Sequence, residues 1–326
     1  MKKTLQPPIQ FPLWQICAIV FLFLTLVMQL LGSYLPEGEE NPSELAKILD
    51  FGFHQYQSAP LWVPVLCLIL FTGLMVLYLH RRDEIGCLAE QVQAWLRDRW
   101  WFWFLAAVLA AGIFFLLRNQ FLNPDGMWFA DKFARDIPAK GAHVTHDEMW
   151  ELYLHSRFWL YTNHYFGWSV TFSYQVVSSM AGGAFVFLLW LFSRELLPQK
   201  WLPFFLLVVS GAYMQLYFGD VENYTLTGVL ILAYLLAALW FLHRKVPVTL
   251  AAGILAVALT FHLLSGFLGP SLLVLYWVAF RRKCFADMAA GVLVFVAIVG
   301  ATLLFLHTHG LPIQDLFYRS FAFGYG

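Results

Sequence analysis

Long apolar runs, separated by short polar segments, are the main pattern of this chain. A helix needs roughly 20 apolar residues to cross the hydrocarbon core of a bilayer, so runs of about that length predict membrane-spanning helices. Seven runs have that length: 13–34, 60–79, 101–117, 169–193, 201–217, 224–242 and 286–306. A further stretch, 247–280, is interrupted by Ser265-Gly266 and Gly269-Pro270, so we interpret it as two short spans, with a re-entrant hairpin as the alternative. The pattern therefore predicts an all-α integral membrane protein with about nine transmembrane helices.

The positions of Lys and Arg predict which side of the membrane each connecting segment faces. Cytoplasmic segments carry an excess of these residues. With a cytoplasmic N-terminus, the inner segments hold 13 of them and the outer segments hold 7, whereas acidic residues show the opposite distribution. We therefore expect a multi-pass protein of the plasma (inner) membrane, with its N-terminus in the cytoplasm and a carboxylate-rich, active face on the non-cytoplasmic side.

The composition is typical of a membrane protein and differs from that of a soluble domain. Hydrophobic residues make up 60% of the 326 residues, charged residues 12%, and the mean hydropathy is +0.67, whereas about one quarter of a soluble domain is charged. Lys and Arg (20) balance Asp and Glu (20), so the net charge predicts no nucleic-acid partner. We divide the chain into residues 1–100, with two spans and a cytoplasmic amphipathic segment, and residues 101–326, a transmembrane core with its longest outer loop at 118–168.

That outer loop is the first candidate for chemistry. Loops of this length are usually functional or disordered, and the many aromatic residues argue against disorder. Its second half predicts an amphipathic helix from Thr145, suited to lying on the bilayer surface or packing against the spans. Glu148, Glu151 and His155 follow at spacings of three and four and share one face of that helix. The structural alternative is a capping box, in which Glu148 bonds back to the backbone N–H of Thr145.

Further acidic residues are expected on the same side of the membrane. Asp147 precedes Glu148, Asp125 follows the end of the span 101–117, and Asp220 and Glu222 lie between two spans without a basic neighbour. A carboxylate can serve as a general base, and paired carboxylates can hold a divalent cation such as Mg²⁺ or Mn²⁺ against a phosphate leaving group. Either role suits the transfer of a group from a lipid phosphate carrier.

This pattern resembles the GT-C superfamily of membrane glycosyltransferases, including its protein O-mannosyltransferase and aminoarabinose-transferase branches. The features that carry the resemblance are the span 101–117, the long outer loop with the Asp147-Glu148 pair, and Gly219-Asp-Val-Glu-Asn-Tyr224 and His262 at the next outer turns. It covers about residues 100–320, and two extra spans precede it, so the key loop is the second outer loop rather than the first. The resemblance implies transfer of a sugar from a polyprenyl-phosphate donor to a lipid, glycan or protein acceptor among the membrane lipids.

Together with the shared helix face, the resemblance provides candidates for each role. Asp147, Glu148 and Asp125 are candidates for catalysis, with Asp147 or Glu148 activating the acceptor hydroxyl. The candidates for substrate binding are Asp220, Glu222, His262, Arg157, Glu151 and His155. Two other functions stay open: a transporter or flippase of lipid-linked substrates, and a non-catalytic membrane subunit. A transporter would need ionisable residues near the midplane of the spans, where the sequence has almost none.

Overall fold

The computed structural model describes residues 69, 73, 87, 90–118, 124–140, 145 and 147–311. The chain forms two compact units, 1–92 and 93–326, and nearly all of the described residues belong to the second. They form helices and no strands. The elements are α4 (Trp100–Leu116), α5 (Pro124–Lys140), α6 (Met149–Phe166), α7 (Val170–Leu196), α8 (Trp201–Val209), the 3-10 helix η2 (Ala212–Tyr217), α9 (Thr225–Leu242), α10 (Val248–Phe261), the 3-10 helix η3 (Leu263–Leu268), α11 (Gly269–Arg281) and α12 (Phe285–Thr308).

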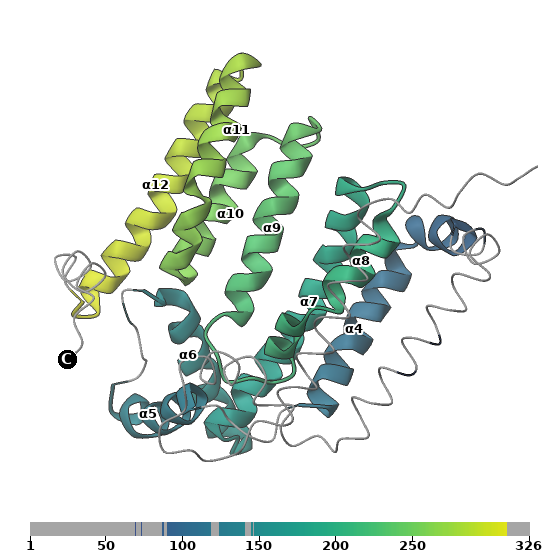
Figure 1. The fold of residues 1–326 in the computed structure, drawn as a ribbon. Coiled ribbons are helices and arrows are strands. Elements are labelled where there is room, and N and C mark those ends of the chain that lie inside the picture. The colour runs from purple at the N-terminus through teal and green to yellow at the C-terminus, as the bar shows by residue number, and fades with distance from the viewer. Residues whose placement is uncertain are drawn as a thin grey trace, which may run out of the picture. The chain divides into compact units, whose positions relative to one another are not determined.

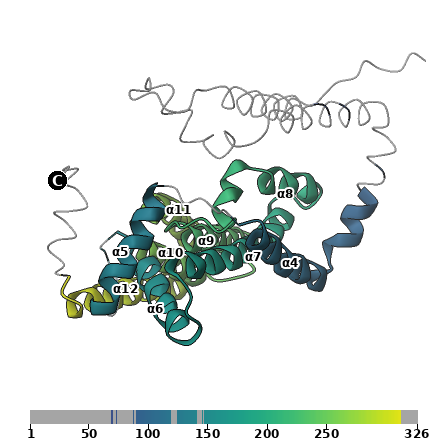
Figure 2. The ribbon, with the colours of Figure 1, turned by 90° about the horizontal axis from the view of Figure 1, so that it is seen from below.

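The long helices of the second unit pack side by side. The order of neighbours is α4, α7, α9, α10 and α12, with α8 on α7 and with α11 against α9, α10 and α12 (Figures 1 and 2). Helices α5 and α6 lie at one end of this bundle, where α6 contacts both α7 and α10 (Figure 1). On α6 the apolar residues Met149, Leu152 and Trp159 are buried, and so are Glu151 and His155, so this helix packs on more than its apolar side.

Several of these helices are suited to a membrane by length and composition. Four pass both criteria: Val170–Leu196, Thr225–Leu242, Leu263–Arg281 and Phe285–Thr308. A fifth span results if the helix Glu90–Arg97 and α4, which meet at 96°, count as one. The all-α membrane class is therefore confirmed for the described part of the chain, but the expected nine spans are not. The predicted spans 13–34 and 60–79 lie, apart from isolated positions, outside the described residues.

The apolar run 201–217, predicted as one continuous span, is broken in the structure. Helix α8 ends at Val209, and Gly211 adopts an extended conformation (φ −68°, ψ 144°) before η2 begins. A Cβ atom at Gly211 would lie 2.4 Å from the ring of Tyr213, so a larger residue there would require this exposed side chain to move. The prediction was wrong here because apolar content alone does not distinguish a straight helix from a broken one. By contrast, the break expected in 247–280 is present, as η3 between α10 and α11.

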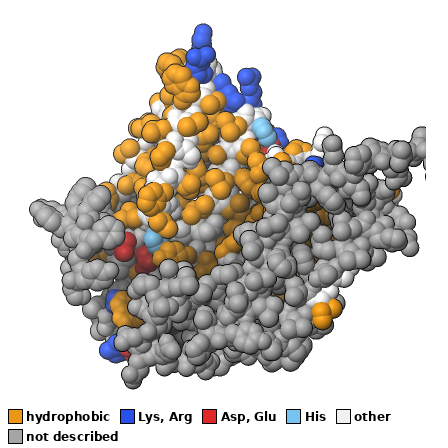
Figure 3. All heavy atoms as spheres, in the orientation of Figure 1, with side chains coloured by type: hydrophobic (Ala, Val, Ile, Leu, Met, Phe, Trp, Pro, Cys, Tyr) orange, Lys and Arg blue, Asp and Glu red, His pale blue; other side chains and the backbone are white. Residues whose placement is uncertain are grey.

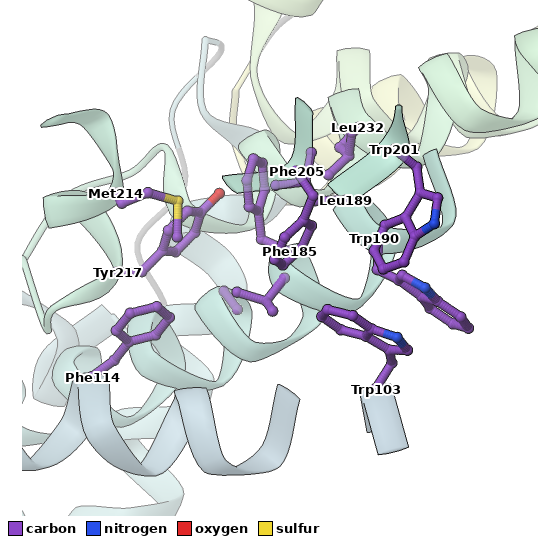
Figure 4. Packing of buried hydrophobic residues seen from close by; sticks show 12 residues of the cluster. Trp103, Phe114, Phe185, Leu189, Trp190, Trp201, Phe205, Met214, Tyr217 and Leu232 are labelled. Carbon is purple, nitrogen blue, oxygen red and sulfur yellow. The ribbon is translucent and has the colours of Figure 1, made fainter. Parts of the chain in front are cut away.

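Close approach of α4 and α7 builds the largest core of the bundle. A Cβ atom at Gly183 would lie 2.6 Å from the backbone oxygen of Ala107, so only glycine allows the two helices to come this near. Next to this contact, the indole of Trp103 stacks on that of Trp190 with ring centroids 5.6 Å apart (Figure 4). Trp190 and Trp201 have no exposed surface. This core holds α4, α7, α8 and α9 together, and it therefore fixes the position of the turn before α9, which carries Asp220 and Glu222.

Charged residues gather at opposite ends of the bundle. The turns that join α7 to α8, α9 to α10 and α11 to α12 carry basic residues, and these turns lie at the same end of the bundle, which we call the basic end (Figures 1 and 3). They hold Lys200, Arg244, Lys245, Arg282 and Lys283. The start of α6 and the turn before α9 lie at the other end, which we call the acidic end, and carry Asp147, Glu148, Asp220 and Glu222.

Candidate functional site

The acidic end is assembled where the start of α6 meets two turns from distant parts of the sequence. The hydroxyl oxygen of Thr145 accepts a hydrogen bond from the Glu148 N–H (3.3 Å). The carbonyl of Asp147 accepts one from the Leu263 N–H (2.9 Å), which ties this segment to η3. These bonds fix the backbone at Asp147 and Glu148, and they leave the carboxylate of Asp147 exposed.

The carboxylate of Glu148 contacts side chains from both turns. One oxygen, Oε2, accepts a hydrogen bond from Asn223 Nδ2 (2.9 Å), and Oε1 lies 3.5 Å from His262 Nε2. The exposed fractions of the Glu148 and His262 side chains are 16% and 12%, so the pair lies near the surface of the acidic end, at what we call its rim, and is not fully buried. Only half of the predicted capping box forms: Thr145 caps the Glu148 N–H, whereas the Glu148 carboxylate contacts Asn223 and His262 instead.

The hydrogen bonds of His262 indicate its tautomer. Its Nδ1 accepts a hydrogen bond from the Leu264 N–H (3.1 Å), so the proton of the neutral ring belongs on Nε2, which faces Glu148. The ring of Tyr224 stacks on the imidazole at 5.0 Å between centroids. His262 is therefore a donor towards Glu148, held in place on two sides.

Glu151, one turn further along α6, has a different environment. Its side chain is completely buried. Its carboxylate accepts hydrogen bonds from the N–H groups of Leu226 and Thr227 (both 3.1 Å) and from the hydroxyl of Thr227 (3.1 Å). These groups form the first turn of α9, whose own N-cap residue, Tyr224, provides no side-chain cap. Glu151 therefore satisfies amide groups that a helix leaves without intrahelical partners, and its negative charge favours that helix end.

His155 joins Glu151 to the rest of the acidic end. It is 2% exposed, its Nε2 lies 3.6 Å from Glu151 Oε1, and its ring stacks on Tyr174 with centroids 3.8 Å apart. The Tyr174 hydroxyl donates to Asn223 Oδ1 (3.2 Å), and Asn223 in turn donates to Glu148. A continuous set of contacts thus runs from the buried face of α6 to the exposed rim.

The turn before α9 carries the remaining acidic candidates. Gly219 has a positive φ of 73°, and a Cβ atom there would lie 2.8 Å from the Cβ of Arg118. Asp220 is only 9% exposed, and burial raises the pKa of its carboxyl above the usual 3.8, against the opposing effect of a hydrogen bond from the Val221 N–H. Glu222 is half-buried. Asn223 is the residue of this turn that reaches Glu148.

Two candidates lie apart from these contacts. Asp125 belongs to the first turn of α5, and its side chain is outside the described residues. Arg157 lies on an exposed part of α6. Asn223 was not among the predicted site residues, and its one signal in the sequence is its place beside Glu222 in the Gly219–Tyr224 motif.

The described residues contain no group of three or more His, Cys, Asp or Glu side chains arranged to hold a metal ion. The acidic end presents the exposed residue Asp147 one position before Glu148, whose carboxylate pairs with the imidazole of His262. No protein-family model matches this chain, and no match was found among curated proteins or solved structures.

Proposed function

We propose that the chain is a membrane glycosyltransferase of the GT-C type, which moves a sugar from a polyprenyl-phosphate carrier to an acceptor hydroxyl at the acidic end. The observation that carries this proposal is that the exposed residue Asp147 directly precedes Glu148, which pairs with His262 at the same end of the bundle. Nine spans, a cytoplasmic N-terminus and a non-cytoplasmic acidic end belong to the same proposal.

In the proposed reaction, Asp147 is the general base. Its carboxylate takes the proton of the acceptor hydroxyl while the acceptor oxygen forms a bond to C1 of the sugar. The bond between C1 and the phosphate oxygen breaks, its electron pair stays on that oxygen, and polyprenyl phosphate leaves. General-base catalysis of this kind typically contributes about 10²- to 10⁴-fold to the rate. Asp147 suits this role better than Glu148, because both oxygens of Glu148 already face donors.

The remaining residues support the base and the donor. Glu148 holds the imidazole of His262 at the acidic end, where the ring is proposed to lie against the bound donor. Arg157 is exposed on α6 and is proposed to contact the phosphate. Glu151 and His155 are buried and act on the site through the position of α9 and Asn223.

The test is turnover by the full chain in lipid nanodiscs. Radiolabelled hexosyl and pentosyl polyprenyl phosphates are the donors, and a membrane extract supplies acceptors; release of polyprenyl phosphate and transfer of label are measured. We expect Asp147→Asn to lower turnover by about 10²-fold or more, with little change in KM. The matched control is Asp131→Asn, an exposed acid on α5 that is paired with Arg135; it should retain wild-type turnover.

Three outcomes would overturn the proposal. One is wild-type turnover in Asp147→Asn. Another is the absence of turnover of every donor by the wild-type chain. The third is movement of the intact donor across the bilayer without release of the sugar, which would favour a flippase.

A further inference from the structure

A cavity lies at the basic end of the bundle, opposite the acidic end. It has a volume of about 430 Å³ and opens between the turn joining α9 to α10 and the turn joining α11 to α12. Three arginines and one acidic residue line it: Arg244, Arg281, Arg282 and Asp287. The charged residues of the lining therefore give the cavity a net positive charge.

The acidic residue of the lining is committed to the protein itself. Asp287 accepts hydrogen bonds from the N–H groups of Val248 (2.7 Å) and Thr249 (3.1 Å), and so caps the start of α10. Arg282 is also anchored, because its guanidinium donates to the carbonyls of Phe241 (2.8 Å) and Leu242 (2.7 Å) at the end of α9. These hydrogen bonds hold Asp287 and Arg282 in the wall of the cavity.

The other two arginines are available to a ligand. Arg244 and Arg281 are exposed, and within the described part of the chain neither guanidinium has a hydrogen bond or an ion pair. Arg281 lies 6.0 Å from the ring of Trp277. Each guanidinium carries five N–H donors, which can bind an anion in the cavity.

Both turns have the same backbone geometry, and in both a basic residue occupies a strained position. Arg244 (φ 60°) and Lys283 (φ 58°) follow the ends of α9 and α11 in the left-handed conformation that favours glycine. In each turn the next N–H bonds back across the helix end, from Lys245 to the Trp240 carbonyl and from Cys284 to the Ala279 carbonyl. The chain thus keeps long cationic side chains at two positions where glycine would fit with less strain.

An apolar, aromatic surface adjoins the cavity. Trp277, Phe280 and Phe285 are 60%, 50% and 56% exposed and surround the turn that carries Arg281. Further exposed apolar residues continue along α11 and α12: Leu273, Val274, Val292, Leu293 and Val296. Aromatic side chains at the end of an apolar helix are typical of the membrane interface. The tail of a lipid would lie along this surface while its headgroup reaches the arginines.

We propose that this cavity binds the headgroup of an anionic phospholipid from the surrounding bilayer. The phosphate bonds to Arg244 and Arg281, and the acyl chains lie on the exposed faces of α11 and α12. A free phosphate ion would use the arginines but not the aromatic surface, so the lipid is the occupant that explains both. Basic pockets between membrane helices bind anionic headgroups by this chemistry, and each cation contributes to the attraction.

The test compares thermal stabilisation of the detergent-solubilised full chain by added phosphatidylglycerol, by phosphatidylcholine and by inorganic phosphate. We expect phosphatidylglycerol to raise Tm in the wild type, and the other two additives to have no comparable effect. In Arg244→Gln/Arg281→Gln the affinity for phosphatidylglycerol should fall by about 30-fold, from the loss of two cations. The matched control is Lys132→Gln/Arg135→Gln on α5, which removes the same charge at the acidic end and should respond like the wild type.

The substituted arginines are exposed, so the Tm of the double variant without added lipid should equal that of the wild type. Arg244→Lys/Arg281→Lys should restore most of the phosphatidylglycerol effect. An equal response to phosphatidylglycerol in the Gln double variant would overturn the proposal. Equal stabilisation of the wild type by phosphatidylcholine or by inorganic phosphate would overturn it too, as would a wild type that responds to no lipid.

Discussion

Replacing Glu151 by Gln should destabilise the bundle strongly, although the two side chains have nearly the same size. The carboxylate accepts hydrogen bonds from Leu226 and Thr227 at the start of α9 and is completely buried. Gln retains one carbonyl oxygen, but its NH₂ group would face the Thr227 N–H, which leaves one buried donor unsatisfied and weakens the remaining bonds. An unsatisfied buried donor costs about 1–3 kcal/mol, and bonds to a charged acceptor are worth roughly twice neutral ones. We therefore expect a loss of about 2–4 kcal/mol.

The measurement is thermal unfolding of the full chain in detergent, followed by tryptophan fluorescence. For a chain of 326 residues, about 2–4 kcal/mol corresponds to a decrease in Tm of roughly 3–6 °C. The control Asp131→Asn removes an exposed carboxylate from α5 and should change Tm by no more than about 2 °C. If Glu151→Gln unfolds within about 2 °C of this control, Glu151 does not hold α9 in the way that the contacts indicate.

The remaining predictions concern pH and packing. Because burial raises the folded-state pKa of Asp220 above 3.8, the stability that its protonated form contributes is complete below pH 3.8 and is lost as pH rises through the raised pKa. As pH rises from acidic to neutral, the Tm of wild type should therefore fall relative to the Tm of Asp220→Asn. A Tm difference that does not change with pH would show that the pKa of Asp220 is not raised in the folded state. At the contact of α4 and α7, Gly183→Ala places a Cβ 2.6 Å from the Ala107 oxygen and should cost about 1–3 kcal/mol in unfolding measurements. The matched Gly112→Ala, which meets nothing within 4 Å, should be neutral or stabilising, and equal effects of the two substitutions would contradict the close approach.

The apolar pattern predicted the positions of most described helices, because burial in a bilayer or in a helix bundle demands the same residues over the same length. It could not predict the break at Gly211, since the run 201–217 is apolar on both sides of the turn. The local rules were partly right at α6. The Thr145 cap of the Glu148 N–H is formed, but the Glu148 side chain bonds to Asn223, a residue far along the chain. The spacing of residues along a helix predicts hydrogen bonds within that helix. It does not predict which distant turn the fold places next to it.

Residues that the sequence places on one face of α6 differ in how deeply they are buried. Glu148, Glu151 and His155 follow at helical spacing, yet the Glu148 side chain is 16% exposed, whereas those of Glu151 and His155 are sealed inside. The rim position leaves Glu148 and its neighbour Asp147 within reach of a substrate, while the buried position commits Glu151 to the start of α9. Stability and chemistry should therefore respond to different substitutions one helical turn apart. Asp147→Asn should lower turnover at an unchanged Tm, and Glu151→Gln should lower Tm first. A large loss of Tm in Asp147→Asn would mean that this carboxylate, too, serves the fold rather than a substrate.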